Sequence, residues 1–260
     1  MHDVRDRRLL FVTTRKVLIT GVCGGIGSAA ARAFSRAGWG VIGIDQSEPS
    51  DDIEIDRFEI VDISQSDQIA ELFQKLTGEL DGLHALVNNA ATQVNKPIVE
   101  TNDDDWEHII NTNVRSAFQC IREAHPLLSA VNGSVVNVSS VHALATSMNV
   151  AVYAISKGAL VALTRSAALE LADNGIRCNA VLPGAIDTKM LRSGLDRRPH
   201  PDGPEGNLQV LADRTPLKFV ATADDIAPSI LHLADNDQSK YTTGQMLVVD
   251  GGATIRLSTE

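Results

Sequence analysis

The sequence predicts an α/β fold in which a single doubly wound, Rossmann-type parallel sheet carries helices on both faces. Three observations predict it. Short apolar segments alternate with helix-forming segments along the chain, the first apolar segment runs into a glycine-rich turn, and no repeat interrupts the pattern. Such alternation is typical of a parallel sheet covered on both faces. A chain of 260 residues is compatible with one large domain of this kind.

The first βαβ unit occupies about the first thirty residues of this pattern. "KVLIT" at 16–20 is a short apolar, β-branched run, which predicts a strand. "GVCGGIG" at 21–27 predicts a tight turn, and "SAAARAFSRAG" at 28–38 predicts a helix that ends at a glycine. "GVIGID" at 40–45 predicts the second strand.

The alternation continues through the rest of the chain. Residues 1–15 are predicted to be a polar arm, and residues 16–260 a single domain. The stretch 185–215 contains Pro199, Pro201 and Pro204, and we expect an irregular lid loop there. Further strands are expected at 57–62, 84–90, 133–140, 176–184 and 245–250, and helices at 66–77, 103–130, 151–173 and 223–235.

The composition excludes several classes of protein. With 43% hydrophobic and 22% charged residues, the chain is typical of a soluble globular protein. A net charge of -10 argues against nucleic acid as the main partner, because phosphate binding favours a basic surface. No apolar run approaches the roughly 18 residues of a membrane span, and "LLFV" near the start is too short for a signal-peptide core. The spacing of Cys23, Cys120 and Cys178 indicates no metal site, and a reduced, cytoplasmic compartment is the simplest interpretation.

The glycine-rich turn predicts a phosphate-binding site. Such a turn, placed between a strand and its helix, brings backbone N–H groups against a phosphate at the helix N-terminus. Gly21, Gly25 and Gly27 would permit the tight turn and the close approach. No Lys-Ser/Thr pair follows, which excludes the P-loop form of this motif. A merely structural turn is the alternative.

Asp45 indicates which nucleotide the turn would bind. It ends the second predicted strand, about twenty residues past the glycines, where a carboxylate can accept hydrogen bonds from an adenosine ribose. The same carboxylate would repel a 2′-phosphate, and Gln46 and Ser47 follow it rather than Arg or Lys. The position therefore favours NAD over NADP. The alternative is that Asp45 only caps a turn.

"YAISK" at 153–157 places a phenol and an ammonium four residues apart. On a helix, Tyr153 and Lys157 would lie on one face, one turn apart. A cation lowers the pKa of a neighbouring phenol and makes it a usable acid or base near neutral pH. For a lone pair at this spacing, a solvated helix face is the alternative.

Seven short motifs occur in one order along the chain, and together they resemble the short-chain dehydrogenase/reductase family over residues 16–252. Each motif alone is weak, but the ordered set is specific. Ala91 departs from the family, which often has Gly there. The motifs are "TGVCGGIG" (20–27), "NNAA" (88–91), "NTN" (111–113), "NVSS" (137–140), "YAISK" (153–157), "LPG" (182–184) and "TGQMLVVDGG" (243–252).

The resemblance implies a set of catalytic residues. Tyr153 would be the general acid/base, and Lys157 would stabilise its phenolate and bind the nicotinamide ribose. Ser140 would hold the substrate oxygen, with Ser139 as the competing candidate. Asn113 would position Lys157 through a water, the alternative being an Asn that only bonds backbone within its helix.

The resemblance also implies the cofactor contacts, with NAD as the cofactor and no metal. Asp62 has the alternative of a strand-end turn residue, and Cys23, inside the glycine loop, could be a redox sensor or a small filler. The implied cofactor-binding residues are Gly21, Gly25, Ile26, Gly27, Asp45, Asp62, Ile63, Asn89, Ala90, Tyr153, Lys157, Pro183, Gly184, Ile186 and Thr188.

The substrate is a small molecule whose identity the motifs leave open. The lid sequence carries Lys189, Arg192, Arg197, Arg198 and His200 against Asp196, a local positive excess that could attract a carboxylate, phosphate or sulfonate. A solvated basic face, or pairing with another subunit, is the alternative. The candidate substrate-binding residues are Gln93, Ser140, His142, Asn149 and Arg192.

Three functions remain open. The first is an NAD-dependent oxidoreductase acting on a secondary alcohol or carbonyl of a sugar, polyol or hydroxy acid, neutral or anionic. The second is an NADPH-dependent 3-oxoacyl-type carbonyl reductase, against which Asp45 counts. The third is a catalytically silent nucleotide-binding sensor or scaffold, which would have no chemical reason to keep Asn113, Ser140, Tyr153 and Lys157 together.

The helix predicted at 151–173 is apolar around much of its circumference, which is more than one covered face needs. In the resembling family this helix packs across a subunit interface. We therefore expect a homotetramer or a dimer, formed through the helices at 105–130 and 151–173. A monomer in which neighbouring elements cover the whole helix is the alternative.

Overall fold

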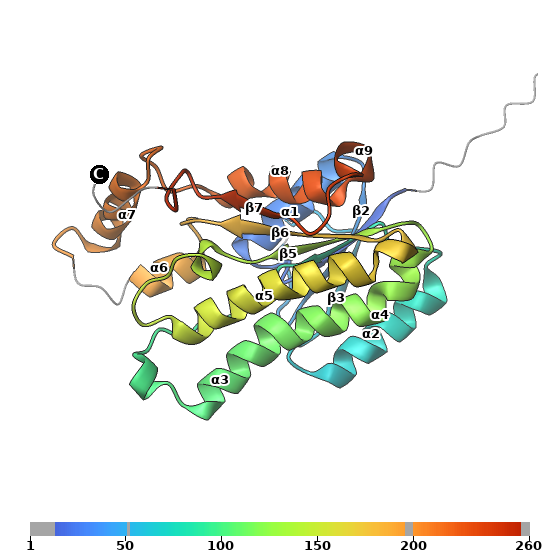
Figure 1. Cartoon of the computed structure of the whole chain (residues 1–260), viewed down its shortest axis with the longest axis horizontal. Coiled ribbons are helices and arrows are strands. Elements are labelled where there is room, and N and C mark those ends of the chain that lie inside the picture. Colours follow the sequence, from blue (N-terminus) through green and yellow to red (C-terminus); the bar gives the residue numbers. More distant parts are fainter. Residues whose placement is uncertain (1–13, 51–52, 196–199, 256–260) are drawn as a thin grey trace, which may run out of the picture.

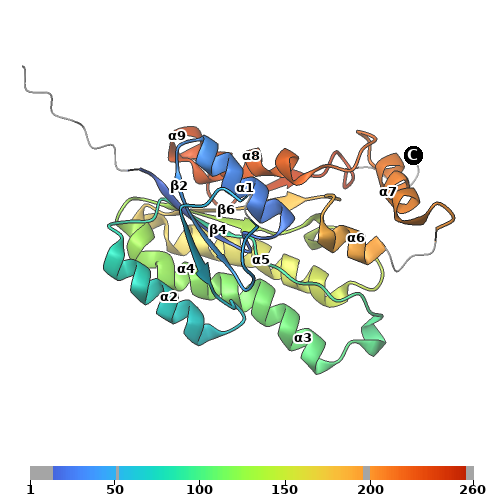
Figure 2. The same cartoon turned by 180° about the vertical axis from the view of Figure 1, so that it is seen from behind.

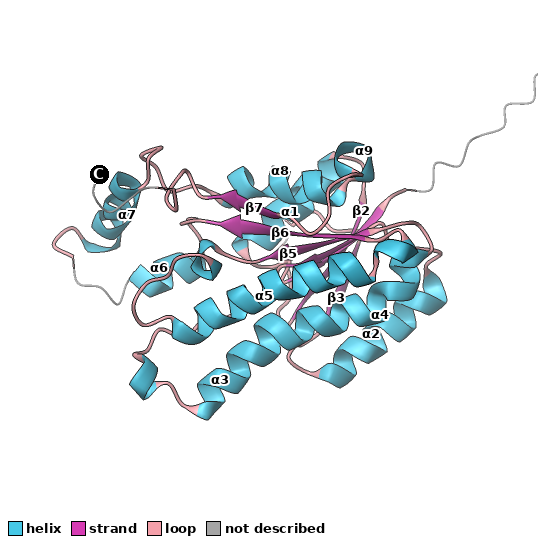
Figure 3. Cartoon of the chain, viewed as in Figure 1, coloured by secondary structure: helices cyan, strands magenta, loops and turns pink. Residues whose placement is uncertain are grey.

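The computed structural model describes residues 14–50, 53–195 and 200–255. Within these ranges a seven-stranded sheet has the order β3-β2-β1-β4-β5-β6-β7, and every pairing is parallel. Helices cover both faces, as the two opposite views and the colouring by secondary structure show (Figures 1, 2 and 3). The predicted α/β class and doubly wound parallel sheet are confirmed.

The strands are short and mostly buried. The predicted bounds of the first two strands are confirmed, whereas the other predicted segments extend into the loops at one or both ends. The strands are β1 (Lys16–Thr20), β2 (Gly40–Asp45), β3 (Arg57–Ile60), β4 (Ala85–Asn88), β5 (Ser134–Val138), β6 (Arg177–Pro183) and β7 (Met246–Val249).

The helices form two layers, each with its own core. Successive strand side chains point to opposite faces, so Val17 and Ile19 belong to one core and Leu18 to the other. One face carries α1 (Gly25–Arg36), α8 (Ala223–Ala234) and the short α9 (Asn236–Ser239). The other carries α2 (Ser66–Glu79), α3 (Asp103–Ile110), α4 (Ser116–Ser129) and α5 (Ala151–Glu170).

The helix predicted at 103–130 is interrupted by a π-helical turn, η2 (Asn111–Arg115), between α3 and α4. Such turns are frequent at functional sites, because the extra residue re-aims a side chain. Here the turn buries Asn113, which is only 1% exposed.

The first helix begins earlier than predicted. The prediction started it at Ser28, but α1 begins at Gly25, inside the glycine turn. Its N-cap residue is Gly24, and no side chain caps its first turn. The backbone amides of the glycine turn therefore form the helix N-terminus itself.

The expected irregular stretch at 185–215 is wrong for most of its length. It contains two helices, α6 (Lys189–Leu195) and α7 (Gly203–Arg214). Pro204 lies in the first turn of α7, where proline is tolerated because the N–H it lacks would have no partner within the helix. Both helices lie beyond the carboxyl ends of β6 and β7 (Figures 1 and 2).

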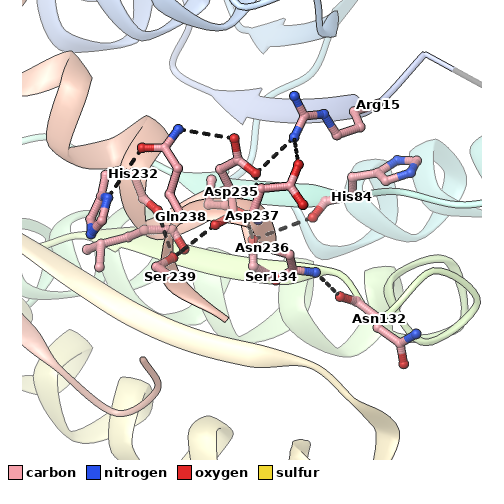
Figure 4. A network of polar contacts seen from close by, with 12 residues as sticks. Arg15, His84, Asn132, Ser134, His232, Asp235, Asn236, Asp237, Gln238 and Ser239 are labelled. Carbon is pink, nitrogen blue, oxygen red and sulfur yellow. Dashed lines mark hydrogen bonds and ion pairs between the residues drawn. The ribbon is translucent and has the colours of Figure 1, made fainter. Parts of the chain in front are cut away.

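The amino ends of the strands are tied by a polar network that includes Arg15 (Figure 4). Arg15 donates to Asp235 at 2.8 Å, and its guanidinium lies 4.6 Å from the centroid of the Trp39 ring. Ser134 donates to the carbonyl of Ala234 at 2.7 Å. Arg15, assigned by prediction to the polar arm, therefore contacts the folded chain; residues 1–13 lie outside the described residues.

Candidate active site

A cavity of about 1160 Å³ opens at the carboxyl ends of the strands. Its walls come from segments that follow all seven strands, β1 to β7. The order of the sheet reverses between β1 and β4, and doubly wound sheets bind ligands in the crevice at such a point. The strands β3 and β2 lie to one side of this point, and β5, β6 and β7 to the other.

Glycines form the floor of the cavity for steric reasons. Gly21 has φ +66°, and a Cβ there would lie 2.7 Å from Ala90 Cα. A Cβ at Gly25 would lie 2.8 Å from the methyl group of Thr188, across the cavity. Gly27 does not line the cavity; a Cβ there would lie 2.1 Å from the carbonyl oxygen of Gly21, so its role is close packing of the turn. This uncapped helix N-terminus fits the phosphates of a dinucleotide.

Two carboxylates lie at the β2 and β3 end of the cavity. Asp45 accepts hydrogen bonds from the Cys23 amide at 3.1 Å and the Ser47 amide at 3.2 Å, so it also stabilises the turn, as the alternative interpretation proposed. Asp62 accepts from the Ser64 amide at 2.9 Å. Burial would raise the pKa of Asp62, but hydrogen bonds from Ser64 and Gln65 hold this pKa below its ordinary value. Both carboxylates line the cavity.

Ser140, Tyr153 and Lys157 are buried and line the same cavity. Ser140 follows β5 and is hydrogen-bonded to Tyr153, which lies in the first turn of α5. Lys157, one turn further, donates through Nζ to the carbonyl of Val138 at 2.8 Å. Ser139 instead donates to the backbone carbonyl of Lys157 at 2.7 Å, so the geometry favours Ser140 as the hydroxyl that faces a substrate.

In the protein chain alone, burial has a larger effect on the pKa of the phenol than Lys157 has. Burial raises the pKa of Tyr153 to about 12, and the hydrogen bond with Ser140 offsets only part of this. Burial also lowers the pKa of Lys157 to about 7. A site with little water disfavours both charged forms, so a phenolate at neutral pH needs a further positive charge beside it. The ring of an oxidised nicotinamide is such a charge.

Asn113 acts as a clamp between two segments of the site. Its side-chain amide donates to Thr92 O at 2.9 Å and to Ser156 Oγ at 3.0 Å, and its oxygen accepts from the Thr92 amide at 2.8 Å. Ser156 donates in turn to the carbonyl of Tyr153 at 2.7 Å. The side chain of Asn113 thus joins the loop after β4 to the first turn of α5, rather than bonding within its own helix.

Sequence reasoning missed Ser156, although a signal was present. Serine within a helix often bonds a carbonyl one turn earlier, and Ser156 lies three residues after Tyr153. The other implied cofactor residues line the cavity, and one of them, Asn89, already makes hydrogen bonds within the chain. Its side chain donates to the carbonyls of Thr20 and Gly21 at 2.9 and 3.0 Å. The lining includes Ile26, Ile63, Asn89, Ala90, Pro183, Gly184, Ile186 and Thr188.

Two of the candidate substrate residues line the cavity beside Ser140. The ring of His142 meets the ring of Tyr153 edge-on, with 5.7 Å between centroids, and burial lowers the pKa of His142. Its Nδ1 lies 3.1 Å from the hydroxyl of Thr146. Gln93 donates to the carbonyl of Met190 in α6 at 3.3 Å, which links the loop after β4 to the lid.

Asn149 and Arg192 do not line the cavity, so they are unsuited to bind substrate there. Asn149 is exposed with φ +66°, a conformation that Asn tolerates, so its residue type serves the turn before α5. Arg192 donates twice to Asp187, at 2.6 and 2.8 Å, and once to Glu205 at 2.7 Å. Its charge is thereby neutralised by two carboxylates of its own chain.

The rest of the predicted basic run is described only in part. Arg197, Arg198 and Asp196 lie outside the described residues. Lys189 lines the cavity, and so does Arg214, which the sequence analysis did not single out because it expected no helix there.

Cys23 lacks the low pKa that a redox sensor needs. Burial raises the pKa of its thiol to about 11, and the carboxylate of Asp45 acts in the same direction. The sulfur donates to the carbonyl of Ser47 at 3.3 Å. The structure therefore favours the small filler over the sensor.

Two properties bear on the wider class of the protein. Across the described part of the chain, no helix has the length and apolar character needed to cross a membrane. In the same ranges no three His, Cys, Asp or Glu side chains converge as metal ligands would.

Comparisons with known proteins agree with this geometry. A family model described as Enoyl-(Acyl carrier protein) reductase matches residues 21–254. The chain is 34% identical over 246 residues to Dehydrogenase/reductase SDR family member 6 of Xenopus laevis, covering 92% of this chain and 97% of that one. It is 33% identical over 248 residues to the 3-oxoacyl-[acyl-carrier-protein] reductase FabG of Thermotoga maritima, with the same two coverages.

A solved structure shows the same fold. It is that of the aldohexose dehydrogenase of Thermoplasma acidophilum in ligand-free form. The TM-score is 0.89 and the sequence identity 29%, and the match covers 94% of this chain and 96% of the other.

Proposed function

The chain belongs to the short-chain dehydrogenase/reductase family of oxidoreductases, and we propose that it is an NAD-dependent dehydrogenase that acts on a secondary alcohol or carbonyl. The substrate class is a small polar molecule, such as a sugar, polyol or hydroxy acid. The observation that carries this proposal is the single cavity that holds Ser140, Tyr153 and Lys157 together with the glycine turn and Asp45.

The residues of the chain divide the work of the reaction. The cofactor supplies the group that accepts or gives the hydride. The hydroxyls of Ser140 and Tyr153 hold the oxygen of the substrate, and in the direction of oxidation Tyr153 takes the proton of the alcohol. Lys157 in its ammonium form stabilises the resulting phenolate, and the clamp of Asn113 and Ser156 keeps the turn that carries Tyr153 in place.

NAD rather than NADP is proposed from the charge at the adenosine end of the cavity. Asp45 and Asp62 line this end, and Gln46 beside them is uncharged. A carboxylate at the end of the second strand accepts bonds from the ribose and repels a 2′-phosphate. Carboxylates here would raise the free energy of bound NADP relative to NAD.

Two supports favour a polar alcohol as the substrate. The aldohexose dehydrogenase of similar fold acts, by its name, on a sugar. Around Ser140 the cavity also presents polar side chains, namely Gln93, Asn95, His142, Thr146 and Ser147.

A 3-oxoacyl-type reductase is the second candidate, favoured by the likeness to FabG of Thermotoga maritima. The charge of Asp45 counts against it, because such a reductase would use NADPH. A silent sensor or scaffold is the third candidate. Burying the lysine and the tyrosine beside one cavity costs free energy, because both polar groups lose water. A silent sensor would gain nothing from this arrangement.

We also propose a cytoplasmic homotetramer or dimer. Large apolar side chains are exposed on the predicted interface helices, among them Trp106 on α3, Phe118 on α4, and Ile155 and Leu169 on α5. Exposed apolar side chains gathered on one layer are typical of interaction surfaces. Light scattering coupled to size-exclusion chromatography measures the mass; a monomer at micromolar concentration would contradict the proposal.

The test of the catalytic proposal is turnover with and without the phenol hydroxyl. NADH formation is followed by absorbance on a panel of sugars, polyols and hydroxy acids, with NAD and NADP side by side. Tyr153→Phe should reduce turnover of any substrate found by about 100-fold or more, while cofactor binding persists. If turnover survives this change, Tyr153 is not the acid/base; activity with NADP alone would contradict the assignment of Asp45.

A further inference from the structure

The charges that line the cavity are divided between its two sides. Among the described residues of the lining, the carboxylates are Asp45 and Asp62, both at the ends of β2 and β3. The lysine and arginine side chains of the lining, Lys157, Lys189 and Arg214, belong to α5, α6 and α7. The chain has a net charge of -10, so the absence of described carboxylates from this side of the lining is not a consequence of composition.

Two of these cations have other tasks. Lys157 donates to Val138 and lies against the ring of Tyr153. Lys189 follows Thr188, whose methyl group lies 2.8 Å from the position of a Cβ at Gly25. This contact places the start of α6 over the glycine turn, where Lys189 would face the phosphates of the cofactor.

Arg214 is the third of these cations, and no other task is assigned to it. It makes no ion pair with any residue in the described ranges, whereas Arg192, on the neighbouring helix, is neutralised by Asp187 and Glu205. Arg214 is exposed and lines the cavity. The lid thus neutralises one arginine outside the cavity and leaves another unpaired within its wall.

Arg214 lies at the β6 and β7 end of the cavity, whereas Asp45 and Asp62 lie at the opposite end of the sheet, after β2 and β3. It is the last residue of α7, and its neighbours Leu211 and Thr215 also line the cavity. The methyl group of Thr215 lies 2.6 Å from the position of a Cβ at Gly251, just after β7. In Figure 1, α7 lies beyond the carboxyl ends of β6 and β7, next to α6.

We propose that Arg214 binds an anionic group of the substrate, a carboxylate or a phosphate, and so selects anionic alcohols over neutral ones. This inference rests on the proposed dehydrogenase function and names its substrate class. The guanidinium offers a planar fork of donors that matches both oxyanions. The expectation of an anionic substrate is thereby kept, but the residue that recognises it is Arg214 and not Arg192.

The kinetic test compares matched substrates and matched variants. Hydroxy acids with the hydroxyl on C2, C3 or C4 are each paired with their methyl ester, and polyols with their phosphate esters. In the unaltered protein the anionic member should have the higher kcat/KM. Arg214→Gln should lower kcat/KM for the anionic member by about tenfold or more, and change the neutral member by less than about twofold.

Two further variants make the result specific. Arg214→Lys keeps the charge without the fork and should retain part of the preference. Arg36→Gln is the matched control, because Arg36 is also the exposed last residue of a helix but lies outside the cavity lining. Activity on the neutral member reports that each variant is folded. Equal loss on both members, or no loss on either, would overturn the assignment.

A second experiment does not need turnover. Phenylglyoxal modifies accessible arginines, and mass spectrometry measures its rate at Arg214 in the NAD-saturated protein. Propionate or inorganic phosphate should slow modification of Arg214 and not of Arg36, compared with propionamide and with chloride at equal ionic strength. The two anions distinguish a carboxylate from a phosphate site.

The two experiments separate the two ideas. If no alcohol is turned over but anions protect Arg214, the anion site stands and the dehydrogenase proposal fails. If alcohols are turned over with no preference for the anionic member, the dehydrogenase stands and the role of Arg214 is refuted. Equal protection by chloride would show charge screening only, and would also refute it.

Discussion

Lys157 Nζ lies 5.5 Å from the centroid of the Tyr153 ring and donates its hydrogen bond to the carbonyl of Val138, the last residue of β5. The residue after next, Ser140, is hydrogen-bonded to Tyr153. A single strand end therefore fixes both members of the helical pair. This is why the pair on α5 is not a solvated helix face, although its spacing alone permits one.

The two neighbouring serines after β5 should respond differently to substitution. Ser140→Ala removes the hydroxyl that faces the substrate oxygen, so kcat/KM should fall by about 100-fold with little change in stability. Ser139→Ala breaks the buried bond to the carbonyl of Lys157. It should lower the free energy of unfolding by about 1 to 3 kcal/mol and reduce activity less.

Steady-state kinetics and urea unfolding of the two variants provide the comparison. Each protein serves as the control for the other, since the residues are adjacent and both are buried. A larger loss of kcat/KM in Ser139→Ala than in Ser140→Ala would reverse the assignment.

Asp45→Asn should change cofactor choice. The substitution keeps the shape, so the side-chain oxygen can still accept from the Cys23 or Ser47 amide, but it removes the negative charge. The ratio of kcat/KM with NAD to that with NADP should fall by about tenfold or more, because repulsion of the 2′-phosphate is lost.

Asp62→Asn is the matched control at the same end of the cavity. It removes a charge that the resemblance places at the adenine, so it should weaken both cofactors together and leave their ratio nearly unchanged. An unchanged ratio in Asp45→Asn would mean that Asp45 serves only the turn.

Much of this site can be predicted from local sequence. The remaining parts could not be predicted, because they are determined by long-range packing. The bounds of β1 and β2 were predicted because both strands are continuous apolar runs between turn residues. The helix α7 was missed because its prolines lie at and before its first turn, where a proline starts a helix as readily as it marks a loop.

The ion-pair partners of the lid arginines are still harder to predict from local sequence. A basic run in the lid gives no information about which arginine is neutralised. Arg192 is neutralised because α6 and α7 pack so that Glu205 contacts it, and because Asp187 lies just before α6, within reach of its side chain. Arg214 faces the cavity because α7 ends there. Both outcomes depend on the arrangement of two helices.

The ion pairs of Arg192 should stabilise the lid locally. Arg192 beside Asp187 holds the pKa of that carboxyl below its ordinary value, and the bond to Glu205 ties α6 to α7. Glu205→Gln should raise amide hydrogen exchange in α6 and α7 and increase KM severalfold. Global stability should change by less than about 1 kcal/mol, because these side chains are largely exposed.

The ion pair between Arg32 and Asp224 is the control for this experiment, since it also joins two helices at the surface. Arg32→Gln should leave amide hydrogen exchange in α6 and α7 unchanged, and KM as well. If Glu205→Gln changes neither, the two helices are held by packing alone.

The burial of Lys157 should make stability depend on pH. Its pKa is about 7 in the folded protein and about 10.5 when unfolded, so between these values the unfolded chain binds the extra proton. Stability therefore rises with pH across this window, by on the order of 1 kcal/mol per pH unit. Lys157→Met removes the titrating group and should remove this slope.

The clean interval for the measurement runs from about pH 7 to 9. His84 and His142, whose pKa values burial lowers from 6.5, titrate below it. The thiols of Cys23, Cys120 and Cys178, whose pKa values burial raises from 9.0, begin to titrate in the unfolded chain toward pH 9, but both proteins contain them, so their contribution cancels when the two curves are compared. Urea unfolding at one protein concentration, at several pH values without cofactor, gives the two curves. The two curves should diverge as pH falls from 9 to 7, with the unaltered protein losing stability relative to Lys157→Met. Parallel curves would show that Lys157 keeps an ordinary pKa and that burial does not destabilise its ammonium form.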